Sequence, residues 1–141
     1  MIRVLIADDR KLLRNCLQAL LTREQDMQVV AQAGDGQEAV DLAKDLSPDV
    51  VLMDIRMPCL NGLEATRQIL RQSHSQVLIV AMIWDAQMVH QAVDTGARGC
   101  VSKIDAFDEI IPAVRAVHSG RSYFSKDTLA FLSPFAAPPR N

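Results

Sequence analysis

A short apolar run that ends on a carboxylate lies near the middle of the sequence: Val50-Val51-Leu52-Met53-Asp54. Four consecutive apolar residues without polar alternation are typical of a central strand that is covered on both faces of a sheet. A second run, from Ile2 to Ala7, is interrupted only by Arg3 and leads directly into Asp8 and Asp9. Both predicted strands therefore place acidic residues at their carboxyl ends.

The rest of the chain alternates short apolar runs with amphipathic segments. Further strands are predicted at residues 29–31, 77–80 and 100–101. Helices are predicted at residues 12–21, 36–46, 63–70, 86–93 and about 106–118, the last capped by Asp105, with a short terminal helix within 121–132. Five strand–helix units in succession predict right-handed crossovers and an α/β fold, with helices on both faces of a parallel sheet.

The composition of the chain limits the classes of protein to which it can belong. The chain has 141 residues, of which 49% are hydrophobic and 23% charged, and its net charge is -2. This indicates one folded domain and excludes both a disordered chain and a chain that is basic as a whole and wraps nucleic acid. No apolar run approaches the roughly 20 residues that span a bilayer, and we expect a cytoplasmic domain. Cys16, Cys59 and Cys100 lack the spacing of a zinc site and are expected to be reduced thiols.

The residues at the strand ends suggest a site. In a parallel sheet with the order 2-1-3-4-5, Asp8, Asp9, Asp54 and Lys103 converge on one crevice. Three acids packed together repel one another unless one is protonated or a cation intervenes, and a Mg²⁺ ion with oxygen ligands is suited to that place. A carboxylate beside such an ion can attack a phosphoryl group, and Lys103 could pair with a phosphate oxygen. Any one of these acids alone could equally be a loop residue or a helix cap.

With these residues the chain resembles the receiver domains of two-component response regulators, and the resemblance covers residues 1 to about 120. Its motifs are most similar to those of the LuxR-type (NarL/FixJ-like) subfamily. The stretches that carry the resemblance are Val4-Leu5-Ile6-Ala7-Asp8-Asp9, Pro48 through Pro58, Asn61-Gly62-Leu63-Glu64-Ala65-Thr66 and Gly96 through Lys103.

The resemblance implies a flavodoxin-like (βα)5 three-layer sandwich with the strand order 2-1-3-4-5. It implies that Asp54 is the phosphoacceptor for a partner sensor histidine kinase. It also implies Mg²⁺ bound by Asp9, Asp54 and the main-chain carbonyl of Arg56, with Asp8 assisting through water, and a Lys103 that contacts the phosphate.

The resemblance further implies a domain organisation. Residues 1–120 are expected to form the receiver domain, and residues 121–141 a terminal segment and a proline-containing linker. In the LuxR-type group such a linker precedes a helix-turn-helix DNA-binding domain, which these 141 residues lack. The expected protein is a transcription regulator, not an enzyme, and contacts DNA only through that domain. A homodimer could form through the first and last helices or through the helix at 86–95, and the sequence does not distinguish these faces.

Two residues depart from the family pattern. Ala81 stands where the family has Ser or Thr, and Cys100 stands where it has an aromatic residue. Both usual members of the hydroxyl–aromatic relay are missing, which favours an alternative: a pseudo-receiver that acts as a phosphorylation-independent protein-interaction module. Trp84 also has two interpretations. It either packs on the sheet edge or, with Met82 and Ile83, forms an apolar loop that covers the site or binds a partner.

Two enzyme classes are weaker alternatives. The stretch Gly34-Asp35-Gly36-Gln37-Glu38-Ala39 fits a dinucleotide-binding fingerprint. That fingerprint belongs after the first strand, where Asp8 and Asp9 would repel a pyrophosphate, so Gly34 and Gly36 are predicted to be turn residues. A metal-dependent phosphatase that uses Asp54 covalently would need a cap and a substrate pocket, for which 141 residues leave no room.

Overall fold

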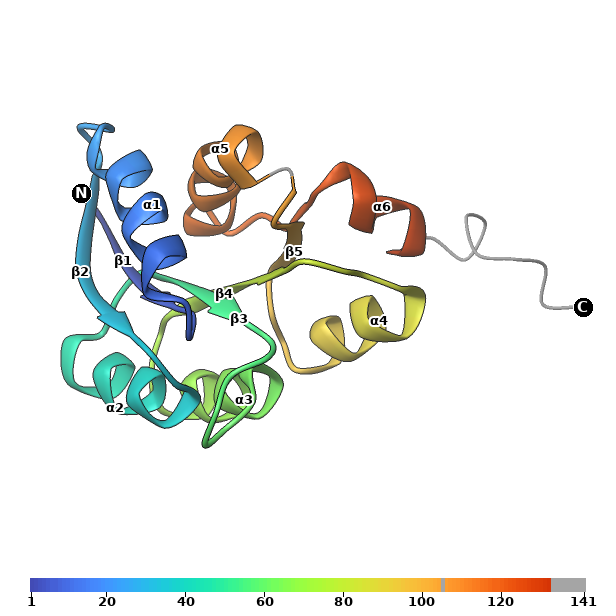
Figure 1. Ribbon diagram of the computed structural model, residues 1–141, viewed down its shortest axis with the longest axis horizontal. Helices are drawn as coiled ribbons and strands as arrows, with labels where there is room; N and C mark the ends of the chain where they lie inside the picture. The colour runs from blue at the N-terminus through green and yellow to red at the C-terminus, as the bar shows by residue number, and fades with distance from the viewer. Residues whose placement is uncertain (105, 133–141) are drawn as a thin grey trace, which may run out of the picture.

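The protein folds around one parallel sheet with helices on both faces (Figure 1). The structure, a computed structural model, describes residues 1–104 and 106–132. The predicted cap Asp105 and the predicted linker residues 133–141 lie outside that range. The strands are β1 (Ile2–Ala7), β2 (Met27–Ala33), β3 (Val50–Asp54), β4 (Gln76–Ala81), β5 (Gly99–Ser102) and β6 (Tyr123–Phe124). The helices are α1 (Lys11–Thr22), α2 (Gly36–Leu46), α3 (Gly62–Gln72), α4 (Ala86–Asp94), α5 (Ala106–His118) and α6 (Lys126–Leu132).

The sheet order is β2-β1-β3-β4-β5-β6, and every neighbouring pair is parallel. The predicted order of the first five strands and the α/β flavodoxin-like fold are therefore confirmed. The sixth strand was not predicted, because two residues are too few to show a strand pattern. Tyr123 and Phe124 pair with Gly99 and Cys100 of β5, which makes β6 the edge of the sheet.

Alternating side chains of the strands divide the core into two layers. Leu5 and Ala7 of β1 pack with the apolar faces of α2, α3 and α4, whereas Val4 and Ile6 pack with α1 and α5. This period of two along a strand follows from the pleat, which points successive side chains to opposite faces. Because both faces are covered, the central strands read as unbroken apolar runs in the sequence.

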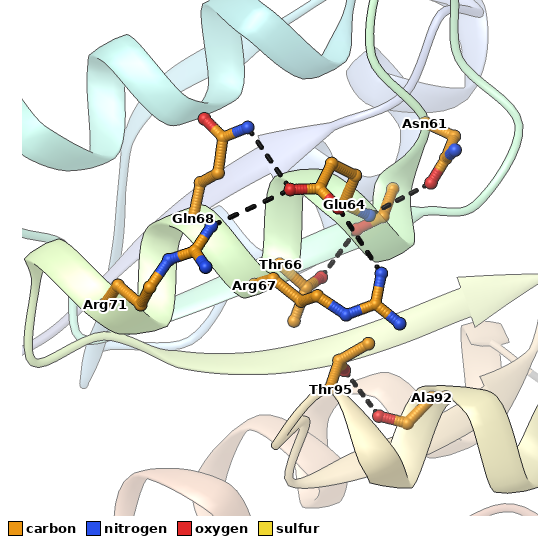
Figure 2. Close-up of polar contacts among 9 residues, drawn as sticks. Asn61, Glu64, Thr66, Arg67, Gln68, Arg71, Ala92 and Thr95 are labelled. Carbon is orange, nitrogen blue, oxygen red and sulfur yellow. Dashed lines mark hydrogen bonds and ion pairs between the residues drawn. The ribbon is translucent and has the colours of Figure 1, made fainter.

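The start of α3 is fixed by polar contacts of its own side chains (Figure 2). The Asn61 side chain caps the helix by accepting a hydrogen bond from the main-chain N–H of Glu64 at 3.0 Å. The Glu64 carboxylate in turn accepts from Arg67 and Gln68, both at 3.4 Å, and lies 3.7 Å from the Arg71 guanidinium. These contacts hold the first turn of α3, and hence the end of the loop that connects it to β3.

Among the described residues, no helix combines the length and the apolar character that a membrane span needs.

Candidate functional site

The carboxyl ends of three strands bring four charged residues together. Asp54 is the last residue of β3, while Asp8 and Asp9 directly follow β1. The register aligns Ala7 with Met53, so the acidic residues at the ends of β1 and β3 lie at the same level of the sheet. Lys103 follows β5 on the other side of β4, and its main-chain N–H donates to the Ala81 oxygen at 2.8 Å.

The Lys103 ammonium bridges the two buried carboxylates. Its Nζ lies 2.7 Å from Asp8 Oδ2 and 3.3 Å from Asp54 Oδ1. The three side chains are only 5%, 3% and 8% exposed, in the order Lys103, Asp8, Asp54. Asp9 is exposed, and one carboxylate oxygen from each of the three acids lies within 4.8 Å of the others. The arrangement is a small acidic crevice with a lysine at its floor.

Charge in this crevice is only partly balanced. Three carboxylates and one ammonium leave a formal excess of two negative charges. Burial raises the pKa of the Asp54 carboxyl, and the nearby Asp8 charge raises it further, while Lys103 opposes both effects. The chemical consequence is a set of oxygen donors suited to a hard divalent cation.

The loop after β3 is held close to the site by its main chain. The Gly62 N–H donates to the Ile55 oxygen at 2.8 Å, and a Cβ built on Gly62 would lie 1.9 Å from the Asp54 oxygen. Only a glycine allows this approach of the two main chains. The exposed Arg56 lies in this loop and, with Ala81, borders a cavity of about 140 Å³ beside the crevice.

The two departures from the family pattern lie in the buried core. Ala81 is 5% exposed at the end of β4, and Cys100 is fully buried in β5. Burial raises the pKa of the Cys100 thiol to about 12. Neither side chain can donate the hydrogen bond or fill the aromatic volume that the relay positions normally supply.

The hypothesis that Trp84 is an exposed partner anchor is wrong. Its side chain is 8% exposed and packs in the apolar core, and its Nε1 donates to the Val101 oxygen at 3.2 Å. The indole is amphipathic, so it can be buried once its N–H has an acceptor. The exposed apolar surface of this loop belongs instead to Met82 and Ile83, which are 47% and 71% exposed.

Comparison with known proteins agrees with this geometry. A family model described as "Response regulator receiver domain" matches residues 4–115, which include all four charged residues of the crevice. The chain belongs to the response regulator receiver domain family.

Relatives of this receiver domain carry the names of transcriptional regulatory proteins and of response regulators. The chain is 42% identical over 121 residues to the transcriptional regulatory protein LnrK of Bacillus subtilis (strain 168), covering 85% of this chain and 55% of that protein. It is 39% identical over 126 residues to the response regulator GacA of Pseudomonas aeruginosa, covering 89% of this chain and 59% of that protein. The receiver domain thus spans just over half the length of these relatives.

Solved structures show the same fold. A LuxR-family two-component response regulator from Aurantimonas sp. SI85-9A1 matches with a TM-score of 0.85 at 33% identity, covering 89% of this chain and 90% of that one. The signal receiver domain of the putative response regulator NarL from Mycobacterium tuberculosis matches with a TM-score of 0.81 at 32% identity, covering 85% and 98%. The predicted LuxR-type subfamily is confirmed by these matches.

Two residues of interest were missed in the sequence. Ser125 and Thr128 have fully buried side chains that bond to β5. A hydroxyl residue directly before a helix, with a second one three positions later, is a recognisable N-terminal pattern. That pattern predicts a helix start, but it does not show that the helix starts against β5.

Proposed function

We propose that this receiver domain accepts a phosphoryl group on Asp54 from a sensor histidine kinase and so regulates transcription. The observation that carries the proposal is the pair of short contacts from Lys103 Nζ to Asp8 and Asp54 in a nearly buried crevice. Family membership supports signalling by phosphorylation, and the residues that perform it are inferred from the crevice.

The chemistry follows from the positions of the charged groups. A carboxylate oxygen of Asp54 attacks the phosphorus of a phosphohistidine, an O–P bond forms, and the P–N bond breaks with its electron pair returning to the imidazole. The product is an aspartyl phosphate on this chain. Lys103 lies where its ammonium can leave the Asp54 oxygen for a phosphoryl oxygen. The domain is itself modified in this reaction, so we do not class it as an enzyme.

The donor set of the crevice fits Mg²⁺. Asp8, Asp9 and Asp54 offer closely spaced carboxylate oxygens, which Mg²⁺ prefers, and the excess negative charge matches a divalent ion. Asp9 and Asp54 would hold the ion with the main-chain carbonyl of Arg56, and Asp8 would assist through water. When bound, such an ion neutralises the charge of an incoming phosphoryl group.

The output we propose is control of transcription through a C-terminal helix-turn-helix domain in the whole protein. The similar protein LnrK carries the name transcriptional regulatory protein, and the chain matches only 55% of its length. In this proposal DNA is contacted by that further domain and not by the receiver.

Ala81 and Cys100 favour a second candidate, a pseudo-receiver that binds a protein partner without being phosphorylated. Without a hydroxyl at position 81, a phosphoryl group on Asp54 loses one charge-assisted hydrogen bond. In this candidate the crevice is a remnant of the fold.

Intact-mass spectrometry after treatment with acetyl phosphate and Mg²⁺ distinguishes the two candidates. The phosphoacceptor proposal expects one phosphoryl group on the wild type and none on Asp54→Asn. A matched control is Asp94→Asn, which changes an exposed carboxylate at the end of α4 and should be modified like the wild type. A wild type that stays unmodified at saturating donor would favour the pseudo-receiver.

A further inference from the structure

The C-terminal segment is bound to β5 immediately before Lys103. The Ser125 N–H donates to the Cys100 oxygen at 2.9 Å, and Thr128 Oγ1 donates to the same oxygen at 3.0 Å. Two residues further along β5, the Ser102 N–H donates to Ser125 Oγ at 3.0 Å. We call Ser102, Ser125, Thr128 and the Cys100 carbonyl the β5–α6 clamp.

The β5–α6 clamp is deeply buried. Ser125 and Thr128 are fully buried and Ser102 is 1% exposed. A buried hydroxyl or amide that loses its partner incurs the full cost of desolvation, since no water replaces the bond. When β5 shifts, the start of α6 must therefore follow it.

Lys103 connects this clamp to the acidic crevice. Its Nζ bonds to Asp8 and Asp54, and the preceding residue in the chain is Ser102 of the clamp. A phosphoryl group on Asp54 would draw the ammonium away from its present partners and so pull on the Lys103 main chain, whose N–H is bonded to the Ala81 oxygen of β4. That pull reaches the Ser102 N–H through the main chain of one residue.

The β4–α4 loop is the alternative route by which a change at the crevice could be transmitted, but this chain lacks the side chains for it. Ala81 has no hydroxyl to follow a phosphoryl group, and Cys100 has a short, buried side chain that cannot swing between two positions as an aromatic ring can. Trp84 Nε1 also holds the loop to the Val101 oxygen. The contacts from β5 to α6 remain as a direct path out of the crevice.

We propose that the β5–α6 clamp transmits the state of the acidic crevice from Lys103 to α6, in place of the hydroxyl–aromatic relay that this chain lacks. The proposal rests on Asp54 being the phosphoacceptor. In this arrangement Ser125 and Thr128 are positioning residues: they do not touch the phosphoryl group, and they make α6 follow β5. The segment that continues from α6 would then receive the signal.

Amide hydrogen exchange by mass spectrometry tests the clamp on the same samples whose intact mass reports phosphorylation. Acetyl phosphate with Mg²⁺ should change the exchange of peptides over 123–132 in the wild type by roughly two- to tenfold, the range expected for altering one hydrogen bond. In Ser125→Ala and Thr128→Val the phosphoryl group should still be added, but this change should be clearly smaller, since only the main-chain bond from Ser125 to Cys100 remains in both. Thr128→Ser keeps a hydroxyl and should therefore show the same phosphorylation-dependent change in exchange as the wild type.

Ser122→Ala is the matched control, since Ser122 is an exposed serine beside β6, and it should behave like the wild type. A further variant avoids phosphorylation altogether: Lys103→Met should alter exchange over 123–132 without any phosphodonor. It also supplies a result if the clamp variants do not fold.

The outcomes separate the two proposals. A phosphorylated wild type with unchanged exchange over 123–132, an equal change in the clamp variants, or an unaltered α6 in Lys103→Met would each overturn the clamp and leave Asp54 as the phosphoacceptor. A wild type that takes no phosphoryl group overturns both.

Discussion

The indole of Trp84 is bonded to the strand that carries Cys100: its Nε1 donates to the Val101 oxygen at 3.2 Å. Both Trp84 and Cys100 lie in the same apolar cluster, together with Val89 of α4. Trp84, in the β4–α4 loop, thus lies near the small residue Cys100 on β5. Cys100 stands at the position where the family has an aromatic residue. The chain keeps an aromatic ring in this part of the core but supplies it from a different element.

Trp84 is the single tryptophan of the chain, so its fluorescence reports this contact directly. We expect emission typical of a buried indole and weak quenching by acrylamide in the native protein. Trp84→Phe keeps a ring but removes the hydrogen bond, and should lower the free energy of unfolding by about 0.5–1.5 kcal/mol beyond the effect of lost volume. Urea titration measures this loss. Native quenching as strong as that of the urea-unfolded chain would contradict the buried position.

Much of the fold and of the crevice could be predicted because the deciding signals are local. Unbroken apolar runs predicted the central strands, and the acidic residues directly after those runs, Asp8 and Asp54, predicted the crevice. The parts that were missed depend on tertiary contacts. The strand at 123–124 depends on Gly99, which lets the Tyr123 main chain approach β5, and the buried N–H of Trp84 depends on the Val101 oxygen that accepts it. Neither partner is visible in a sequence pattern.

Restoring a hydroxyl at position 81 should strengthen the response of the β4–α4 loop. Ala81 borders a cavity of about 140 Å³ together with Ile55 and Arg56, which leaves room for a threonine side chain. A hydroxyl donor to a charged phosphoryl oxygen contributes about 1.5–3 kcal/mol. We expect Ala81→Thr to show a larger phosphorylation-dependent change in amide exchange over residues 81–103 than the wild type.

The control for this change is Ala81→Val, which has nearly the shape of threonine but no hydroxyl. An equal response in Ala81→Thr and Ala81→Val would mean that volume, and not the hydrogen bond, is responsible.

The three cysteines should differ in reactivity. Cys16 and Cys59 are exposed and Cys100 is buried, and burial raises the pKa of the Cys100 thiol to about 12. Because the thiolate is the reactive form, a thiol reagent at neutral pH should label two cysteines rapidly and the third only on unfolding. The double variant Cys16→Ser/Cys59→Ser should show no rapid labelling. Rapid labelling of that variant would place Cys100 within reach of solvent.

Gly62 should tolerate no side chain. A Cβ there would lie 1.9 Å from the Asp54 main-chain oxygen, so Gly62→Ala must displace the end of β3 and the crevice with it. We expect a loss of roughly 1–3 kcal/mol in the free energy of unfolding and slower phosphorylation by acetyl phosphate. At Gly34 the nearest atom to a built Cβ is 3.5 Å away, so Gly34→Ala is the matched control, with a change within about 0.5 kcal/mol. Equal stability of the two variants, measured in urea, would contradict the close approach.

Tyr123 reports the contact between β6 and α5 in alkaline solution. Burial raises the pKa of the Tyr123 phenol to about 12, aided by its hydrogen bond to Glu109, whose carboxylate oxygen accepts from the phenol at 2.7 Å. Since the unfolded value is about 10, the folded state holds the proton more tightly. This contribution to stability is fully present below about pH 10 and is lost as the pH rises toward about 12.

Ultraviolet absorbance of the tyrosinate measures this directly, because the chain contains one tyrosine. We expect a midpoint near 12 in the wild type, and a lower midpoint in Glu109→Gln, where the carboxylate charge that disfavours the phenolate is gone. Glu64→Gln changes a glutamate on α3 and should leave the midpoint as it is in the wild type. A wild-type midpoint near 10, the value of a free phenol, would show that β6 does not hold Tyr123 against α5 in solution.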